Sequence, residues 1–167
     1  ISINSLKTPD RGWLTSLMRR ASVLLKGWNI YLWDNSFIGM MSALFSPRLA
    51  RGNIQALCAD LTTRGFFPNQ AHPLGRNEGI TQLPVTSYCT LKIDQVLGAN
   101  MKGVLSALRS NNGWWIKNRD PNRFHLLSYG TGLNHRCAAA TRQMAKYEAG
   151  MDNHPMFDNA PMDHESG

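Results

Sequence analysis

Residues 34–65 read DNSFIGMMSALFSPRLARGNIQALCADLTTRG, and they carry the most regular pattern in the chain. The leading Asp34 can cap a helix that runs to about Phe45. Ser46-Pro47 then supplies a helix N-cap followed by a proline, which is suited to the first helical position. A second helix is predicted from there to about Thr63. Because the break between the two helices is so short, this stretch predicts an αα-hairpin.

The rest of the chain also reads as helices separated by long loops. Apolar residues recur at helical spacing from Trp13 to Leu25. Three more helices are predicted at 85–97, 101–110 and 134–145, with long loops at 66–84 and 113–133. No alternating pattern of useful length predicts a strand. The predicted fold class is therefore all-α, built from helical pairs.

Composition describes an ordinary globular chain. Its 167 residues are 43% hydrophobic and 17% charged, which is enough for one buried core and argues against disorder. No apolar run approaches the ~20 residues of a membrane span, so none is expected in this segment. The chain starts at Ile1 rather than Met, so we expect it to be a piece of a longer protein.

Charge is unevenly distributed. The net charge is +7, and all eighteen Lys and Arg lie before residue 147, whereas five of the eleven acids follow it. A basic body is compatible with nucleic-acid binding, but the bases occur singly or in pairs rather than in blocks. We interpret them as solvated helix faces and expect no nucleic-acid partner.

Metal and nucleotide chemistry find no support in the sequence. The three cysteines, Cys58, Cys89 and Cys137, include no Cys-x-x-Cys pair, and the five histidines show no i, i+4 pairing. Buried thiols are the simpler interpretation. A glycine-rich phosphate loop and a Gly-x-Ser-x-Gly elbow are also missing from the sequence. We expect no metal and no cofactor.

Two segments concentrate the polar and aromatic residues that a carbohydrate pocket uses. Residues 28–35 read WNIYLWDN and residues 147–155 read YEAGMDNHP. Aromatic rings pack on the apolar faces of sugars, while carboxylates and amides bond to their hydroxyls. Glycoside hydrolysis needs two carboxylates, one of which is protonated. Asp152 and Glu148 are both candidates for the acid, and Gly150 leaves the backbone free to aim Asp152.

Each of these residues also has a structural alternative. Asp34 is equally suited to being a helix N-cap, and Asp152 with Asn153 is suited to an Asx turn before a proline. Glu148 fits a solvated acid at a helix end. The aromatic residues of 28–35 fit a hydrophobic core.

Taken together, the segments resemble a known clan of sugar hydrolases. The order Tyr31-Leu32-Trp33-Asp34, Gly65-Phe66-Phe67-Pro68, Gln82-Leu83-Pro84-Val85 and Leu126-Leu127-Ser128-Tyr129-Gly130 is similar to the first half of trehalases and of glycoside hydrolase family 63. The final segment, Tyr147–Pro155, is the most specific part. The resemblance covers about residues 28–158.

That resemblance implies a fold and an activity. The fold would be a share of an (α/α)6 toroid, with 1–167 forming one partial domain, about half of the catalytic unit. The reaction would be O-glycosyl hydrolysis with inversion and without an organic cofactor. Asp152 matches the general acid, Trp33 and Asp34 match residues that line the terminal-sugar subsite, and Gln82 and Glu148 border it.

The general base of the family lies beyond this chain. The resemblance therefore implies a fragment of an inverting hydrolase of α-glucoside-type or α-mannoside-type linkages, inactive on its own. Its partners would be an oligosaccharide or glycoside substrate and the remaining half of the catalytic domain. The alternative is a non-catalytic remnant that binds carbohydrate or protein. His154 stands where the family pattern has Ser, which bears on substrate preference.

Overall fold

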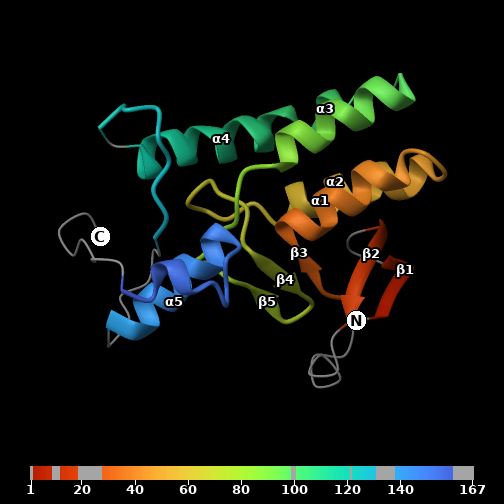
Figure 1. Cartoon of the computed structure of the whole chain (residues 1–167). Coiled ribbons are helices and arrows are strands. Elements are labelled where there is room, and N and C mark those ends of the chain that lie inside the picture. The colour runs from red at the N-terminus through yellow and green to blue at the C-terminus, as the bar shows by residue number, and fades with distance from the viewer. Residues whose placement is uncertain are drawn as a thin grey trace.

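The computed structural model describes residues 2–8, 12–18, 28–98, 101–120, 122–130 and 138–159 (Figure 1). The strands are β1 (Ser2–Thr8), β2 (Gly12–Met18), β3 (Ile30–Tyr31), β4 (Gln70–His72) and β5 (Gly75–Arg76). The α-helices are α1 (Leu32–Ser42), α2 (Pro47–Ala59), α3 (Thr86–Leu97), α4 (Leu105–Arg119) and α5 (Ala138–Ala149). Two short 3-10 helices, η2 (Lys102–Val104) and η3 (Pro155–Phe157), complete the described elements.

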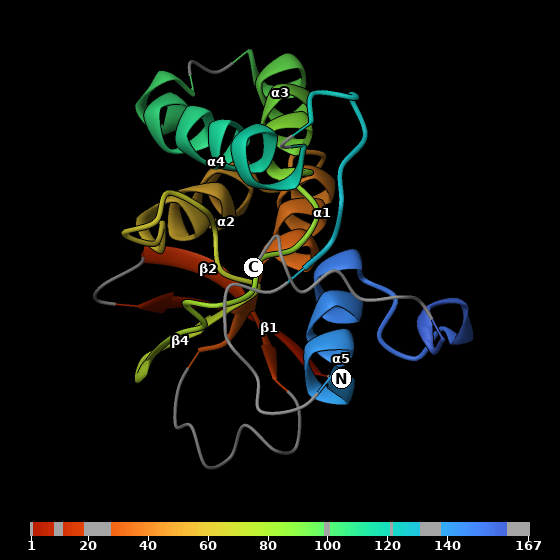
Figure 2. The ribbon, with the colours of Figure 1, turned by 90° about the vertical axis from the view of Figure 1, so that its left-hand side faces the viewer.

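The fold is mixed α/β, so the prediction of an all-α chain forming part of an (α/α)6 toroid is wrong. Strands β1 and β2 form an antiparallel hairpin in which Ser2 pairs with Met18 and Thr8 pairs with Gly12. Strands β3, β4 and β5 form a second antiparallel sheet in that order. Figure 2 shows α3 and α4 at the top, α1 and α2 in the middle and the strands below them.

The helix predicted from Trp13 to Leu25 fails where it overlaps β2; residues 19–27 lie outside the described part of the chain. Both Leu14 and Thr15 are buried, so adjacent side chains of the strand are covered and no polar–apolar alternation marks it. Helix α2 also approaches β2 very closely. A Cβ on Gly52 would lie 1.8 Å from the carbonyl oxygen of Trp13, so only glycine fits there.

The predicted αα-hairpin is present as α1 and α2. Helix α2 begins at Pro47 with Ser46 at the N-cap, as predicted, and ends at Ala59 rather than near Thr63. Helix α1 begins at Leu32 with Tyr31 at its N-cap. The N-cap role considered for Asp34 is therefore wrong, since Asp34 lies within the first turn.

Later helices differ from prediction mainly in their limits. Helix α3 matches its predicted range to one residue, and Gly98 closes it in the left-handed conformation with φ +55°. Helix α4 continues to Arg119 and so includes Trp114 and Trp115, so the prediction of a loop from residue 113 is wrong there. Trp115 is 1% exposed, and burial of a large ring stabilises helix at a position where local sequence signals are weak.

Two hydrophobic clusters hold the layers together. The larger lies among helices α1 to α4, and the smaller lies between α2 and the strands. Burial of each large apolar side chain stabilises the fold by roughly 1.5–3 kcal/mol relative to exposure. The larger cluster includes Leu32, Ile54, Phe67, Ile93 and Leu108; the smaller includes Leu14, Trp28, Ile30, Leu57 and Ala71.

A buried amide network joins α1, α2 and β2. Asn35 Nδ2 donates to the Thr15 carbonyl at 2.7 Å and to Asn53 Oδ1 at 2.9 Å. The same Asn53 oxygen accepts the Thr15 N–H at 3.0 Å, and Asn35 Oδ1 accepts the Tyr31 N–H at 2.9 Å. Both Asn side chains are fully buried, so they fix the register of three elements instead of contacting solvent.

This network makes a first prediction. Asn53→Leu should lower the free energy of unfolding by ~2–3 kcal/mol, because it leaves the buried Thr15 N–H and one Asn35 N–H without a hydrogen-bond acceptor. Gln55→Leu, on the exposed face of the same helix, is the matched control and should change stability little. Urea unfolding followed by circular dichroism measures both. Equal stability of the two variants would contradict the role given to the network.

Candidate functional site

The Asp152 segment begins at a glycine-terminated helix end. Gly150 has φ +69° and follows the last residue of α5. Its N–H donates to the Tyr147 carbonyl at 3.2 Å, and the Met151 N–H donates to the Lys146 carbonyl at 2.9 Å. This pair of bonds is a Schellman motif, which turns the chain sharply out of the helix. Asp152 follows that turn and is exposed.

The Gly150 turn packs against the indole of Trp33. A Cβ built on Gly150 would lie 1.9 Å from Cη2 of Trp33, so the ring rests on the glycine backbone. In Figures 1 and 2 the C-terminal end of α5 accordingly lies beside the N-terminal end of α1. The two segments singled out in the sequence, more than a hundred residues apart, therefore meet in space.

Gln82 supports the same end of α1. Its Oε1 accepts the Trp33 N–H at 3.2 Å, which satisfies one of the N–H groups that a first helical turn leaves without a helical partner. Gln82 is 8% exposed. Asp34 lies half-buried in the same turn, where the helix N-terminus favours a carboxylate.

Glu148 is fully buried and doubly bound to Arg119. Nε of Arg119 donates to Oε1 at 2.6 Å, and Nη2 donates to Oε2 at 3.0 Å. The Gly130 N–H adds a third bond to Oε1 at 3.0 Å. The guanidinium carbon also lies 4.9 Å from the centre of the Trp114 ring. The interpretation of Glu148 as a solvated helix-end acid is therefore wrong.

These contacts distinguish Glu148 from Asp152, the two carboxylates that could act as the acid. Both carboxylate oxygens of Glu148 are already bonded inside the protein, to the Arg119 guanidinium and to the Gly130 N–H. Asp152 has its carboxylate in solvent, while its backbone carbonyl accepts a bond from Gln143 Nε2 at 2.9 Å. Of the two, Asp152 is the one that an incoming ligand can reach.

The five predicted residues lie on the two sides of the contact between Trp33 and the Gly150 turn, and Asp152 follows that turn. Trp33, Asp34 and Gln82 gather at the start of α1, and Glu148 lies at the end of α5 that contacts it. The interpretation of the scattered bases as solvated helix faces is wrong for Arg119, which binds the buried Glu148. No sequence signal separates a buried arginine from a solvated one when the bases are scattered.

The described residues include two cysteines, Cys58 and Cys89. Within the described ranges no group of three or more His, Cys, Asp or Glu side chains is arranged to hold a metal ion. Burial raises the pKa of Cys58 to about 12 and that of Cys89 to about 11, so both remain protonated near neutral pH. Both are free thiols, Cys58 being half-buried, and Cys137 lies outside the described residues.

Among the helices that the structure describes, none is long and apolar enough to cross a bilayer.

Comparison with known proteins relates the chain to a solved structure. That structure is an uncharacterized conserved protein from Thermus thermophilus, which matches with a TM-score of 0.56 and 20% sequence identity. The match covers 78% of this chain and 32% of the Thermus chain, so this chain spans about a third of that protein's length. At this identity the likeness concerns the fold alone. No protein-family profile and no curated protein matches the sequence.

The Trp33 contact predicts that Gly150 is irreplaceable. Gly150→Ala should displace the indole and strain the left-handed turn, and so destabilise the protein by at least ~1–2 kcal/mol. Hydrogen exchange in α5 should rise sharply. Gly103→Ala is the matched control, because a Cβ there meets nothing within 4 Å. If α5 exchanges at the same rate in both variants, the packing of Trp33 on Gly150 is refuted.

The buried ion pair makes a third prediction. Glu148→Gln leaves Arg119 without its counter-charge, so the free energy of unfolding should fall by about 3–5 kcal/mol. Glu78→Gln is the matched control, because Glu78 pairs with Arg76 at 2.5 Å on the surface. Surface pairs of that kind contribute ~0–1 kcal/mol. Thermal or urea unfolding distinguishes the variants, and a loss of the same size in both would contradict the account.

Proposed function

We propose that this chain is part of an inverting O-glycosyl hydrolase acting on α-glucoside-type or α-mannoside-type linkages. Asp152 serves as the general acid, and a carboxylate outside this chain serves as the general base. The terminal sugar lies against Trp33 and Asp34, with Gln82 and Glu148 at its border. The substrate is an oligosaccharide or glycoside, and no metal or organic cofactor takes part.

The observation that carries this proposal is the meeting of Trp33 with Gly150. It brings the aromatic–carboxylate segment at the start of α1 against the turn that presents Asp152. An aromatic ring, two carboxylates and an amide in one place are the groups that a sugar subsite uses. The motif resemblance to sugar hydrolases covers the same segments, and it supports the proposal independently of their position.

In the proposed reaction Asp152 acts as the general acid, and the carboxylate outside this chain acts as the general base. Asp152, in its protonated form, donates its proton to the glycosidic oxygen as the bond to the anomeric carbon breaks. The base removes a proton from a water that attacks the opposite face of the anomeric carbon. Such pairs stand roughly 6.5–9.5 Å apart to leave room for that water.

Glu148 has a different part in this proposal. With both oxygens bound by Arg119, it is a positioning residue that keeps the Asp152 turn in place. Asp152 is assigned the proton transfer because its carboxylate is exposed and open to a substrate.

The alternative is a non-catalytic remnant that binds carbohydrate or protein. The exposure of Asp152 favours this alternative, because no described residue shields the Asp152 carboxylate from solvent as a general acid usually requires. A remnant would bind a glycoside without cleaving it.

The test uses the full-length protein that carries this segment. Asp152→Asn should reduce turnover of an α-glucoside or α-mannoside about 10²–10⁴-fold while leaving substrate binding nearly unchanged. Asp158→Asn is the control, since Asp158 is an exposed acid paired with Lys146. NMR of the first product should show inversion at the anomeric carbon. Unchanged turnover in Asp152→Asn would refute the assignment, and binding without any hydrolysis by the parent protein would favour the remnant.

A further inference from the structure

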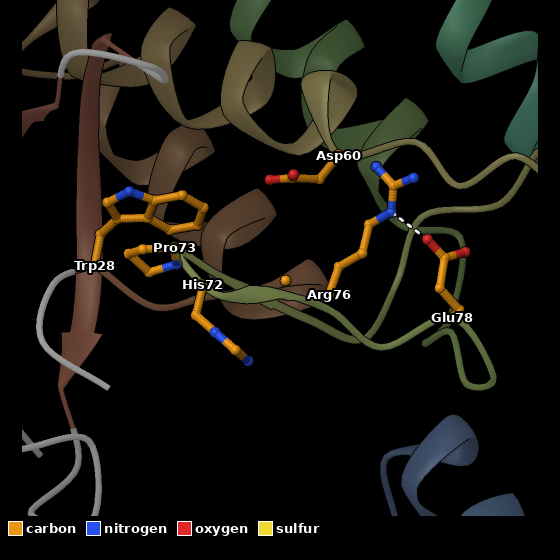
Figure 3. A pocket seen from close by; sticks show the side chains of 7 residues that line it. Trp28, Asp60, His72, Pro73, Arg76 and Glu78 are labelled. Carbon is orange, nitrogen blue, oxygen red and sulfur yellow. Dashed lines mark hydrogen bonds and ion pairs between the residues drawn. The ribbon is translucent and has the colours of Figure 1, made fainter. Parts of the chain in front are cut away.

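A hollow of about 430 Å³ lies beside β4 and β5, lined by residues that have no part in the site described above (Figure 3). Small-molecule pockets have volumes of roughly 300–1,000 Å³, so this one is suited to a small ligand. The side chains that line it come from separate parts of the chain. They are Trp28, Asp60, His72, Pro73, Arg76 and Glu78.

The frame of this pocket is rigid. Trp28 leads into β3 and belongs to the smaller hydrophobic cluster, and Asp60 is the C-cap residue of α2. His72 and Arg76 lie on the paired strands β4 and β5. Trp28 is 5% exposed and Asp60 is 4% exposed, so both are fixed by packing. In Figure 3 the Asp60 carboxylate points into the space between the Trp28 indole and the Arg76 guanidinium.

The pocket offers groups of both charges. Asp60 and Glu78 supply carboxylate acceptors, and Arg76 supplies N–H donors. Nε of Arg76 donates to Glu78 Oε1 at 2.5 Å, and this bond orients the guanidinium. On the rim, Nδ1 of His72 accepts the Leu74 N–H at 3.2 Å, which fixes the imidazole. Trp28 and Pro73 form an apolar wall.

This combination selects against strongly charged ligands. The two carboxylates of Asp60 and Glu78 disfavour an anion, and the Arg76 guanidinium, which is paired with Glu78, reduces the attraction for a cation. A hydroxyl both donates and accepts hydrogen bonds, so a polyhydroxy compound can use carboxylates and a guanidinium at once. Its C–H faces can contact the Trp28 and Pro73 wall.

We propose that this pocket binds a neutral sugar, a monosaccharide or a disaccharide, at a position separate from Asp152. Asp60 accepts hydroxyl bonds at the inner end, Arg76 donates, and Trp28 contacts the ring. The proposal does not depend on hydrolytic activity, because none of its residues belongs to the Asp152 site. The pocket would be a non-catalytic carbohydrate-binding site.

The experiment follows indole N–H resonances in the ¹⁵N-labelled chain. The signals of Trp28 and Trp33 are identified by their loss in Trp28→Phe and Trp33→Phe. The chain is titrated with methyl α-D-glucopyranoside and with maltose, and in parallel with sodium acetate and tetramethylammonium chloride. A saturable shift of the Trp28 signal with either sugar, and none with the two salts, is the expected result.

Variants distinguish this pocket from the Asp152 site. Arg76→Ala, on the edge of the small sheet, should weaken sugar binding at least tenfold without unfolding the chain, and Asp60→Asn should do the same if it folds. Lys117→Ala, which removes an exposed base from α4, should bind as the parent does. Trp33→Phe should retain the Trp28 shift.

Several results would overturn the proposal. They are a Trp28 signal that does not move, one that moves with a salt but with neither sugar, and sugar binding that Arg76→Ala leaves intact. A shift confined to Trp33 would also overturn it, because the sugar would then occupy the Asp152 site. Failure of the hydrolase proposal is read separately, from the turnover of Asp152→Asn, and leaves this test unchanged.

Discussion

The buried ion pair between Arg119 and Glu148 is the constraint on which the candidate site depends. It joins the end of α4 to the end of α5. A buried carboxylate is costly unless it is paired and fully hydrogen-bonded, and this one accepts two guanidinium bonds and the Gly130 N–H. Because Glu148 lies two residues before Gly150, fixing its carboxylate also fixes the turn that leads to Asp152.

The rest of the site follows from where that turn lies. Trp33 packs on Gly150, and Trp33 is in turn held at the start of α1 by Gln82. The Asn35–Asn53 network fixes the angle between α1 and the rest of the core. The chain thus presents Asp152 from an exposed turn on a rigid base. That arrangement leaves the carboxylate accessible from solvent.

The sequence predicted helices better than strands, for identifiable reasons. Ser46-Pro47 is a strong local start signal, and α2 begins there. Strand β2 has no such signal, because Leu14 and Thr15 are buried on opposite faces and Leu14 and Leu17 also fit helical spacing. Trp115 was placed in a loop because the burial that keeps it helical arises from residues far away in the sequence.

For the candidate site as well, the sequence indicated residues through local patterns but not the contacts that depend on the fold. Trp33, Asp34, Glu148 and Asp152 lie in two short segments rich in aromatic, amide and acidic residues, whereas Gln82 was selected only through the resemblance to sugar hydrolases. Their roles could not be separated, since an ion pair with Arg119 depends on the fold that brings α4 and α5 together. The pocket lined by Asp60 and Arg76 was not foreseen, because its residues come from distant parts of the chain and no short motif joins them.

The most direct test of this account is a nuclear Overhauser measurement between the Trp33 ring and Gly150 in the folded chain. Strong cross-peaks are expected between the Hη2 proton of Trp33 and the α-protons of Gly150, and these should disappear when Arg119→Gln removes the ion pair. Absence of these cross-peaks in the parent chain would show that α1 and the Asp152 turn do not meet. The candidate site would then not exist as described.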